Sequence, residues 1–426
     1  MGLSIRPNRF RPWHCDGFPA RFRVLREAKG EVVDSGRKVV RQRCSMILIA
    51  VQVLFWSGAA MLVYTFLGYP VVAALIARCR PQPVHKGDES FLPRVSAVVI
   101  VRNDEARIEG RVRNLLEADY PEGLLDVIVV SDGSTDGTED VLAGIDDPRL
   151  RVIAREEQCG KASGLNAALE AATGDIVVMG DVRQQFASST IRAFVRPFAD
   201  ASVGAACGSL EVIKGEDAVS GGVDAHWRLE NFIRRSEAAV DSSIGYTGAI
   251  CALRRACYSP IPEDTILDDV VIPMTVVTKG HRVVYETQAR GTDPQPFAHD
   301  IERRRKRRTM AGNFQMLFRY PRWLFPWYNR LWWRLISHKY FRLLGFPLML
   351  AVMATNILLL SVPAYRVLLA AQGCFYLLAM LGLALPGRHS RLIALPASFV
   401  FVNWQTMLGL ADYVSGKSRR GWDKAN

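Results

Sequence analysis

Four short polar motifs in this chain of 426 residues carry side chains that could do chemistry. Asp132 lies within Ser-Asp-Gly-Ser-Thr-Asp-Gly-Thr, Asp181 within Gly-Asp-Val-Arg, and the pair Asp268-Asp269 stands directly before Val-Val-Ile-Pro-Met. A positioned carboxylate can accept a proton from a hydroxyl group during a reaction. Lys161 opens a predicted helix, and a cation at a helix N-terminus suits a phosphate. Each motif also fits a structural role, because Asp, Ser and Thr cap helices and form turns.

The elements that would hold these motifs alternate between short β-branched runs and amphipathic helices. This order is typical of a parallel sheet built from β-α-β units. The carboxyl ends of parallel strands meet at one edge of the sheet, where open α/β sheets bind ligands. Asp132 and Asp181 each follow a predicted strand, so we expect both at that edge. The predicted strands are Val95–Val101, Asp126–Val130, Arg151–Ile153, Ile176–Met179 and Val203–Cys207, and helices are predicted at Glu105–Ala118 and Lys161–Ala172.

Several common functional signatures are missing from the chain. There is no G-x-x-x-x-G-K-[ST] motif and no G-x-G-x-x-G after the first strand, which excludes a P-loop NTPase and the dinucleotide-binding fingerprint. The eight cysteines form no C-x-x-C pair and no cluster with zinc-ligand spacing. A disulfide scaffold and a structural zinc domain are therefore excluded, and a reducing compartment is expected.

Apolar segments without charged residues lie towards both ends of the chain. A helix needs about 20 such residues to cross a bilayer. The first segment is Met46–Ala77, and three more follow near the end, at Leu343–Tyr365, Val367–Gly387 and Leu392–Ala411. The sequence therefore predicts a membrane protein with one early span and about three late spans.

The formal net charge of +12 is concentrated beside these apolar segments. Residues 1–45 contain eleven Lys or Arg and four acids, and residues 302–342 contain twelve Lys or Arg and only Glu302. Residues 81–301, in contrast, contain 22 basic and 35 acidic residues. Binding of nucleic acid needs a basic folded surface, so no nucleic-acid partner is expected. Basic residues beside apolar segments instead indicate contact with anionic lipid and a cytoplasmic location.

Taken together, the motifs resemble those of the family 2 glycosyltransferases, and the resemblance extends over roughly residues 92–315. It implies an α/β GT-A fold, a Rossmann-like nucleotide-sugar-binding domain with a mostly parallel sheet, flanked here by transmembrane helices. It also implies inverting transfer of a sugar from a nucleotide-sugar donor, as in membrane-embedded polysaccharide synthases and their relatives. The matching stretches are VSAVVIVRNDEARI, DVIVVSDGSTDGT, GKASGLNAALEAATGDIVVMGD, IGYTGAICALRR, ILDDVVIP and RRKRRTMAGNFQ.

The resemblance assigns a set of residues to the donor. Asp132 would contact the nucleotide base, Asn103 and Glu105 would shape the same pocket, and Lys161 would lie near the base or diphosphate. Asp181 matches the first acid of the family's DxD motif, which holds the diphosphate through a divalent cation such as Mg²⁺ or Mn²⁺. The last acid of that motif is Arg183 here. A lost carboxylate weakens a site for a hard cation, so either Asp181 suffices or Arg183 contacts the phosphates itself.

The resemblance also assigns residues to the acceptor and the diphosphate. Asp269 would be the general base that deprotonates the acceptor hydroxyl, with Asp268 beside it as a modulator or helix cap. Thr247 and Gly248 would form the turn close to the donor sugar. Trp227 and Glu230 are interpreted either as acceptor surface or as a core Trp and a surface Glu. Arg308 is the one residue kept from the Q-x-x-R-W signature of processive synthases, which reads Arg-Lys-Arg-Arg-Thr at residues 305–309.

These interpretations give the chain a predicted organisation and location. We expect a bacterial-type inner membrane protein whose catalytic domain is cytoplasmic. Met46 is the hypothetical native start, because a basic leader outside the membrane would contradict the positive-inside rule. The predicted parts are an unstructured basic leader (1–45), a transmembrane helix (46–77), the GT-A domain (81–317), an amphipathic interfacial helix (318–342), about three transmembrane helices (343–412) and a basic tail (413–426).

The predicted function is transfer of a hexose, from a uridine diphosphate sugar, to a lipid-linked or growing glycan acceptor in cell-envelope or exopolysaccharide synthesis. Two alternatives remain open at this point. A processive polysaccharide synthase would also move its polymer through the late helices. A catalytically silent membrane protein would use the same pocket only to bind nucleotide sugars.

Overall fold

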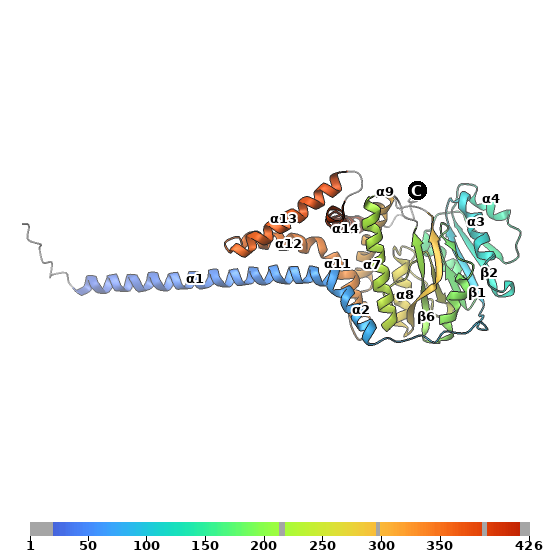
Figure 1. The fold of residues 1–426 in the computed structure, drawn as a ribbon, viewed down its shortest axis with the longest axis horizontal. Helices are drawn as coiled ribbons and strands as arrows, with labels where there is room; N and C mark the ends of the chain where they lie inside the picture. Colours follow the sequence, from blue (N-terminus) through green and yellow to red (C-terminus); the bar gives the residue numbers. More distant parts are fainter. Residues whose placement is uncertain (1–19, 213–217, 295–298, 386–389, 418–426) are drawn as a thin grey trace, which may run out of the picture.

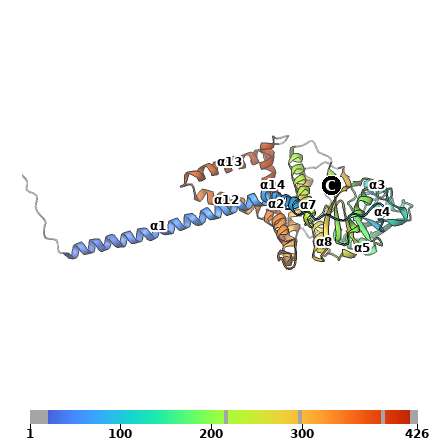
Figure 2. The ribbon, with the colours of Figure 1, turned by 60° about the horizontal axis from the view of Figure 1, so that its bottom comes forward.

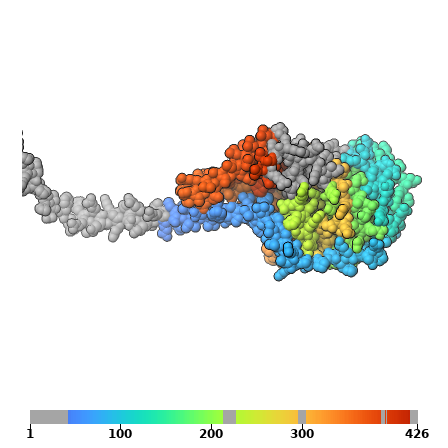
Figure 3. All heavy atoms as spheres, viewed as in Figure 1, coloured from blue at the N-terminus to red at the C-terminus, as the bar shows by residue number. Residues whose placement is uncertain are grey.

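The computed structural model describes residues 20–212, 218–294, 299–385 and 390–417 of the chain. A sheet-containing domain occupies one end, and a bundle of long helices extends from it (Figure 1). In the space-filling view, helices of the N-terminal and C-terminal segments together form a narrow projection from the bulkier domain (Figure 3). The chain thus separates into an α/β part and a helical part.

The α/β part is built on one sheet of eight strands in the order β3-β2-β1-β4-β7-β6-β8-β5. The first four strands in this order pair in parallel, as the sequence predicted. The register places Val101 of β1 opposite Ser131 of β2, so the polar segments after both strands leave the sheet side by side. The bounds are β1 Val95–Val101, β2 Leu125–Asp132, β3 Leu150–Arg155 and β4 Ile176–Met179.

The second half of the sheet is mixed, and most of it was not predicted. Strand β7 (Cys251–Arg254) is antiparallel to both neighbours, β4 and β6. Strand β6 (Val203–Val212) extends the predicted fifth strand and runs parallel to β8 (Arg282–Asp293), and the short β5 (Gln185–Phe186) closes the edge. The mostly parallel α/β architecture is confirmed, with an antiparallel insertion at its centre.

Alternating burial along β1 explains why helices cover both faces of the sheet. Val98 and Ile100 pack in one core, whereas Val95, Ala97 and Val99 pack in the other. This is the two-residue period expected of a strand, and a strand buried on both faces reads as a continuous apolar run. One core includes α5 (Lys161–Ala171) and α8 (Asp268–Thr278), and the other includes α3 (Glu105–Leu116) and α6 (Thr190–Val195).

The N-terminal helix differs from the prediction of an unstructured leader. Helix α1 spans Ala20–Val63, so residues 20–45 continue the helix of the apolar segment. No proline follows Pro19 before Pro70, and most residues between them tolerate a helical backbone. Residues 1–19 lie outside the described part. A π-helical turn at Tyr64–Gly68 joins α1 to α2 (Tyr69–Cys79). Tyr69 and Ala73 of α2 pack against Ile233 of the α/β part.

The predicted interfacial helix of residues 318–342 is not a single helix. Helix α9 (His299–Arg319) ends before Pro321, and a 3₁₀ turn, α10 (Trp332–Leu335), a π-helical turn and α11 (Phe341–Leu343) follow. Two prolines, Pro321 and Pro326, explain the break, because proline removes a backbone donor and clashes with the preceding turn.

The described residues contain three helices long and apolar enough to cross a membrane, Gln42–Cys79, Pro363–Ala384 and Leu392–Val414. The fourth predicted span is a bent pair, Trp332–Leu343 with Gly345–Leu358, at an angle of 63°. Helix α12 (Gly345–Leu358) lies alongside α1 in both ribbon views (Figures 1 and 2), and α13 (Pro363–Ala384) packs against α12. Helix α14 (Arg391–Val414) packs against α9, which joins the membrane-type helices to the α/β part.

Candidate active site

The polar segments after β1 and β2 are joined by side chain to backbone hydrogen bonds. The Asn103 Oδ1 atom accepts a 2.6 Å hydrogen bond from the backbone N–H of Thr135. The Glu105 carboxylate accepts one of 2.8 Å from the backbone N–H of Gly137. Asn103 has a φ of +50°, a conformation that Asn tolerates better than most residues. The structure therefore brings Asn103 and Glu105 to the predicted sheet edge, where they hold the Asp-Gly-Ser-Thr turn.

Asp132 is fully buried at the end of β2 and binds the loop before α5. Its two carboxylate oxygens accept hydrogen bonds from the backbone N–H groups of Cys159 (2.9 Å) and Gly160 (2.8 Å). Gly160 has a φ of +92°, which favours glycine, and Lys161 begins the helix directly after it. Asp132 thereby fixes where α5 starts, and its predicted contact with a nucleotide base stays a prediction.

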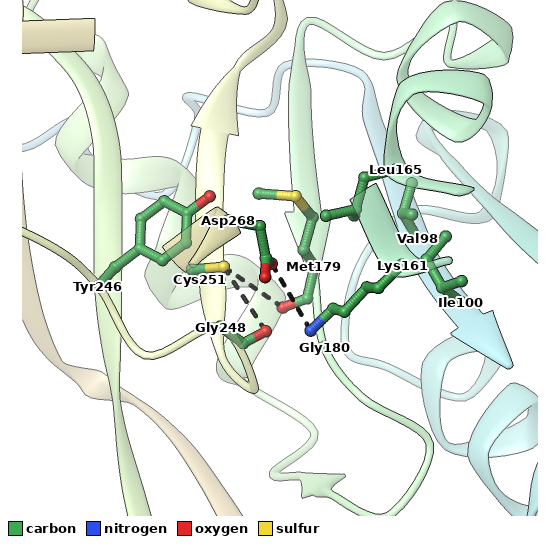
Figure 4. Close-up of a pocket in the computed structure, with 10 residues that line it drawn as sticks. All are labelled: Val98, Ile100, Lys161, Leu165, Met179, Gly180, Tyr246, Gly248, Cys251 and Asp268. Carbon is green, nitrogen blue, oxygen red and sulfur yellow. Dashed lines mark hydrogen bonds and ion pairs between the residues drawn. The ribbon is translucent and has the colours of Figure 1, made fainter. Parts of the chain in front are cut away.

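Lys161 connects two of the acidic motifs. Its Nζ atom lies 2.8 Å from Oδ1 of Asp181 and 3.7 Å from Oδ2 of Asp268. In Figure 4 the lysine reaches from α5 toward Asp268 at the start of α8, with Gly248 beside them. Lys161, Asp268 and Gly248 line one small pocket together with Met179, Tyr246 and Cys251. Three predicted site residues thus converge from β4, α5 and α8.

The turn that contains Gly248 passes unusually close to Asp269. A Cβ atom on Gly248 would lie 3.3 Å from the Cβ atom of Asp269, and 3.8 Å from Nζ of Lys161. The Tyr246 N–H donates a 3.0 Å hydrogen bond to the Asp269 carbonyl oxygen, which holds the two segments together. The missing side chain at Gly248 therefore leaves space beside both Asp269 and Lys161.

Asp269 has the electrostatic character of a proton acceptor. Its burial and the neighbouring Asp268 carboxylate raise the pKa of Asp269 above its ordinary value, although Arg234, Lys339 and Lys161 oppose this shift. A carboxylate with a raised pKa is a stronger base, and a general base works best when its pKa approaches the working pH. The predicted assignment of the base to Asp269 is consistent with this environment.

Thr247 is held from the opposite side by Arg234 of helix α7 (Ala218–Val240). The Arg234 guanidinium donates a 2.7 Å hydrogen bond to Thr247 Oγ1 and lies 3.7 Å from Glu230. Trp227 is half-buried, packs against the sheet core and faces the Arg234 guanidinium at 5.9 Å from its ring centre. Thr247 and Arg234 thus form a buried contact next to the proposed base.

Glu230 is neither an acceptor surface nor a solvated surface residue. It is buried and pairs with Lys339 (3.0 Å), Arg342 (2.9 Å) and His338 (3.1 Å) from the segment before α12. Burial would raise the pKa of Glu230, but Lys339, His338 and Arg342 together lower it well below its ordinary value. The sequence prediction missed this role, because the cationic partners lie about a hundred residues further along the chain.

His338 bridges two buried glutamates of α7. Its Nδ1 lies 2.9 Å from Glu237 and its Nε2 lies 3.1 Å from Glu230. Both ring nitrogens therefore have a carboxylate partner, which holds the imidazole between the two glutamates. Tyr69 of α2 also donates to Glu237. This cluster (Tyr69, Glu230, Arg234, Glu237, His338) connects the N-terminal and C-terminal helices with the turn beside Asp269.

The residues around Asp181 do not fit a site for a divalent cation. Among the residues that the structure describes, no three His, Cys, Asp or Glu side chains group closely enough to hold a metal ion. Lys161 already binds Asp181, and Arg183 stands where the second acid of the motif would be. A hard cation needs several oxygen ligands. Among the described residues the nearby carboxylates, Asp181 and Asp268, both face the Lys161 ammonium group.

Three further cationic residues lie in or beside this part of the site. Arg183 points its guanidinium to Asp293 at the end of β8, at 3.2 Å. Arg308, predicted near the diphosphate, lies on α9 and is exposed, and its charge acts on Lys161. Arg111 was not predicted, because a single Arg within a helix carries no signal of its own. It is fully buried behind Gly180, and this burial lowers its pKa to about 9, while Asp181 opposes the shift.

The mixed sheet, with a parallel first half and helices on both faces, is a GT-A fold. A mannosyltransferase from Pyrobaculum calidifontis, solved in complex with GDP-Man and Mn²⁺, shares this fold with a TM-score of 0.65 at 22% identity. The similarity covers 85% of this chain and 99% of that one, so it includes helices outside the α/β part.

Sequence comparison identifies the family. The sequence profile described as "Glycosyl transferase family 2" matches residues 96–259. An N-acetylglucosaminyltransferase from Bradyrhizobium elkanii is 32% identical over 125 residues, which are 28% of this chain and 67% of the relative. The chain belongs to the family 2 glycosyltransferases.

A beta-monoglucosyldiacylglycerol synthase from Nostoc sp. is 33% identical over 162 residues. This similarity covers 37% of this chain and 34% of the relative, so the chain matches about a third of that protein's length.

Proposed function

We propose that this protein is a membrane-bound inverting glycosyltransferase. It transfers a sugar from a nucleoside diphosphate sugar, with uridine as the expected nucleoside, to a hydroxyl group of a lipid or lipid-linked glycan. The observation that carries this proposal is the convergence of Lys161, Asp268 and Asp269 around Gly248, with Asp181 bound to Lys161. That arrangement combines a cation suited to phosphate, a base with a raised pKa and a glycine turn whose backbone can approach a ligand closely.

The chemistry assigned to Asp269 is general-base catalysis. Its carboxylate takes the proton of the acceptor hydroxyl while the oxygen attacks the anomeric carbon of the donor sugar. The bond from that carbon to the diphosphate breaks on the opposite face, and the diphosphate leaves with the electron pair. A single displacement inverts the anomeric configuration, and no covalent sugar-enzyme intermediate is formed.

The donor would bind along the carboxyl edge of β1, β2 and β4. Asn103 and Glu105 shape the turn after β2, and Asp132 fixes the loop before α5. Lys161 then faces the diphosphate at the start of α5, with Arg183 and Arg308 as further cationic residues. The support for a nucleotide-sugar donor is this geometry together with membership of the family.

The acceptor is proposed to arrive from the membrane. Lys339, in the segment before α12, lies close enough to Asp269 to act on its pKa, so the base lies next to membrane-type helices. The name of the Nostoc relative also refers to a lipid product. Gln and Trp of the processive signature are absent from residues 305–309, which favours single transfer over polymer synthesis.

The proposed location is a bacterial-type inner membrane, with several spans and with the α/β part on the cytoplasmic side. The three candidate spans support membrane attachment. The basic segment of residues 302–342 supports the cytoplasmic orientation, since Lys and Arg accumulate on that side.

The test uses membranes that contain the full chain, a panel of radiolabelled nucleotide sugars and a lipid extract as acceptor source. We expect one donor to give a labelled lipid product. Replacement of the base in Asp269→Asn should lower kcat about 10²- to 10⁴-fold, the usual contribution of a general base. The matched control is Asp264→Asn, an acid of the preceding loop that pairs with Arg319. Nucleotide binding without transfer from any donor would contradict the proposal and favour the silent alternative.

A further inference from the structure

The side chains beside Asp181 are cationic, whereas the side chains that hold a divalent metal ion are anionic. A diphosphate carries several negative charges, and a transferase must compensate them when the sugar leaves. In a metal-dependent site, carboxylates hold the cation that does this. Here the segment after β4 reads Gly-Asp-Val-Arg, so its second charged residue, Arg183, is positive. The protein must therefore supply the compensating charge in another way.

Lys161 occupies the place next to Asp181 that a metal ion would need. Its ammonium group lies 2.8 Å from Asp181 and 3.7 Å from Asp268, and 19% of its side chain is exposed. A divalent cation bound to Asp181 would have to displace this ammonium group or lie directly beside it. Lys161 is held in this position from two sides and still borders the pocket.

Arg183 lies in the segment after β4 and is held by the end of strand β8. Its Nη2 atom lies 3.2 Å from Asp293, the last residue of β8, and the side chain remains 28% exposed. Gln184 donates a 2.8 Å hydrogen bond to the same Asp293 oxygen, which fixes that carboxylate. A planar guanidinium with several donors suits bidentate binding of phosphate oxygens. Arg183 is thus held by Asp293 while part of its side chain remains exposed.

The other charged side chains that act on Asp181 are also cationic. Burial would raise the pKa of Asp181, but Lys161, Arg183 and Arg305 together lower it below its ordinary value. Arg305 belongs to α9 and Arg183 to the segment after β4, so cations approach Asp181 from two separate elements. Asp181 therefore positions cations, and within the described part of the chain it belongs to no group of three or more residues that could hold a metal ion.

We propose that side-chain cations, chiefly Lys161 and Arg183, bind the donor diphosphate in place of a divalent metal ion. Asp181 then acts as the anchor of Lys161. The leaving diphosphate receives its charge compensation from these fixed cations, so donor binding and transfer proceed in the presence of a chelator. This inference rests on the proposed function, because it takes a nucleoside diphosphate sugar as the donor.

The experiment measures UDP binding to the purified full chain in detergent micelles or lipid nanodiscs, by titration calorimetry. Each titration is run with EDTA and with Mn²⁺. We expect the wild-type dissociation constants in the two conditions to agree within about twofold. Removal of one charged hydrogen-bonding side chain in Arg183→Ala should weaken UDP binding at least about tenfold in both conditions.

The decisive variant is Arg183→Asp, which restores two acids around Val182. We expect it to bind UDP weakly in EDTA and to regain at least about tenfold in affinity with Mn²⁺, because the new carboxylate adds a ligand. The matched control is Arg192→Asp, since Arg192 is similarly exposed and pairs with Asp119 in the loop after α3. This control should bind UDP as the wild type does, with or without Mn²⁺. Thermal melting of every variant shows that it is folded.

The outcomes separate this inference from the proposed function. If wild-type binding is lost in EDTA and restored by Mn²⁺, the inference is wrong and the proposed function stands. If Arg183→Ala binds UDP like the wild type, Arg183 does not hold the diphosphate and the inference is equally wrong. If the wild type binds no UDP, GDP or other nucleoside diphosphate in either condition, both the proposed function and this inference are wrong.

Discussion

Arg234 donates a 2.7 Å hydrogen bond to Oγ1 of Thr247, and this contact ties helix α7 to the turn beside Asp269. The same guanidinium faces Glu230, which is also paired with Lys339 and Arg342 from the segment before α12. The base is therefore connected through two buried side chains to helices that are apolar enough to enter a membrane. A lipid acceptor would approach at this junction.

The first prediction concerns Arg234 as a positioning residue. Its positive charge lowers the pKa of Asp269, so Arg234→Met should move the acidic limb of the activity-pH profile to higher pH. Loss of the hydrogen bond to Thr247 should also lower kcat about tenfold. The control is Arg235→Met, the neighbouring residue, which stacks on Tyr285. An unchanged pH profile in Arg234→Met would show that the residue has only a structural role.

The second prediction concerns the pH dependence of the wild type. Burial and Asp268 raise the pKa of Asp269, and the base acts only when deprotonated. Activity should therefore fall on acidification with a midpoint above the ordinary pKa of an aspartate. In Asp268→Asn one source of this shift is gone, so the midpoint should move to lower pH. Rates measured from pH 4 to pH 9 with a saturating donor test both statements, and a midpoint that rises in Asp268→Asn contradicts them.

The third prediction concerns the space at Gly248. A Cβ atom there would lie 3.3 Å from the Cβ atom of Asp269, closer than an ordinary contact, and would extend into the space beside Lys161. Gly248→Ala should reduce kcat/KM about tenfold or more, because misplacement of a reacting group by a fraction of an ångström is costly. Its melting temperature should change little.

Gly110→Ala is the matched control for Gly248→Ala, since a Cβ atom on Gly110 would contact nothing within 4 Å. Gly110 lies within helix α3, where alanine should stabilise the protein by about 0.5–1 kcal/mol without changing the rate. Equal activity of the two alanine variants would contradict the importance of the open space.

The fourth prediction concerns His338 between Glu230 and Glu237. In His338→Leu two buried carboxylates lose a shared hydrogen-bonding partner, so the protein should lose about 3–5 kcal/mol of stability, which is typical of a buried charge left without its partner. Adding Glu237→Gln should restore part of this loss, because it removes one of the uncompensated charges. Thermal unfolding in detergent provides the measurement. His85→Leu, at an exposed position, should change the stability by less than about 0.5 kcal/mol.

The strands and motifs of the first half of the α/β part were predictable from the sequence. Strand β1 spans the predicted Val95–Val101, and β4 spans the predicted Ile176–Met179, because β-branched runs bounded by turns carry a strong local signal. Strands β7 and β8 were missed for the opposite reason. Cys251–Arg254 contains no β-branched residue, and Arg282–Asp293 is largely polar in its second half, so neither stands out locally.

Residue types and their order also determined the family. Six matching stretches in sequence, followed by the comparison with known relatives, place the chain among the family 2 glycosyltransferases. The prediction of a single interfacial helix at 318–342 was wrong because aromatic and basic composition does not define a helix, whereas two prolines within it decide where helices end.

Tertiary structure alone decided which charges meet. Lys161 lies 3.7 Å from Asp268, and His338 contacts Glu230, which is 108 residues away in the chain. Local propensity acts over a few residues, whereas such pairs depend on how the sheet, α7 and the late helices pack together. The sequence by itself determined the fold class, the membrane-type segments and the acids. The packing decided that Asp132 holds a backbone loop, that Glu230 is buried, and that Lys161 and Arg183 surround the position where a metal ion was expected.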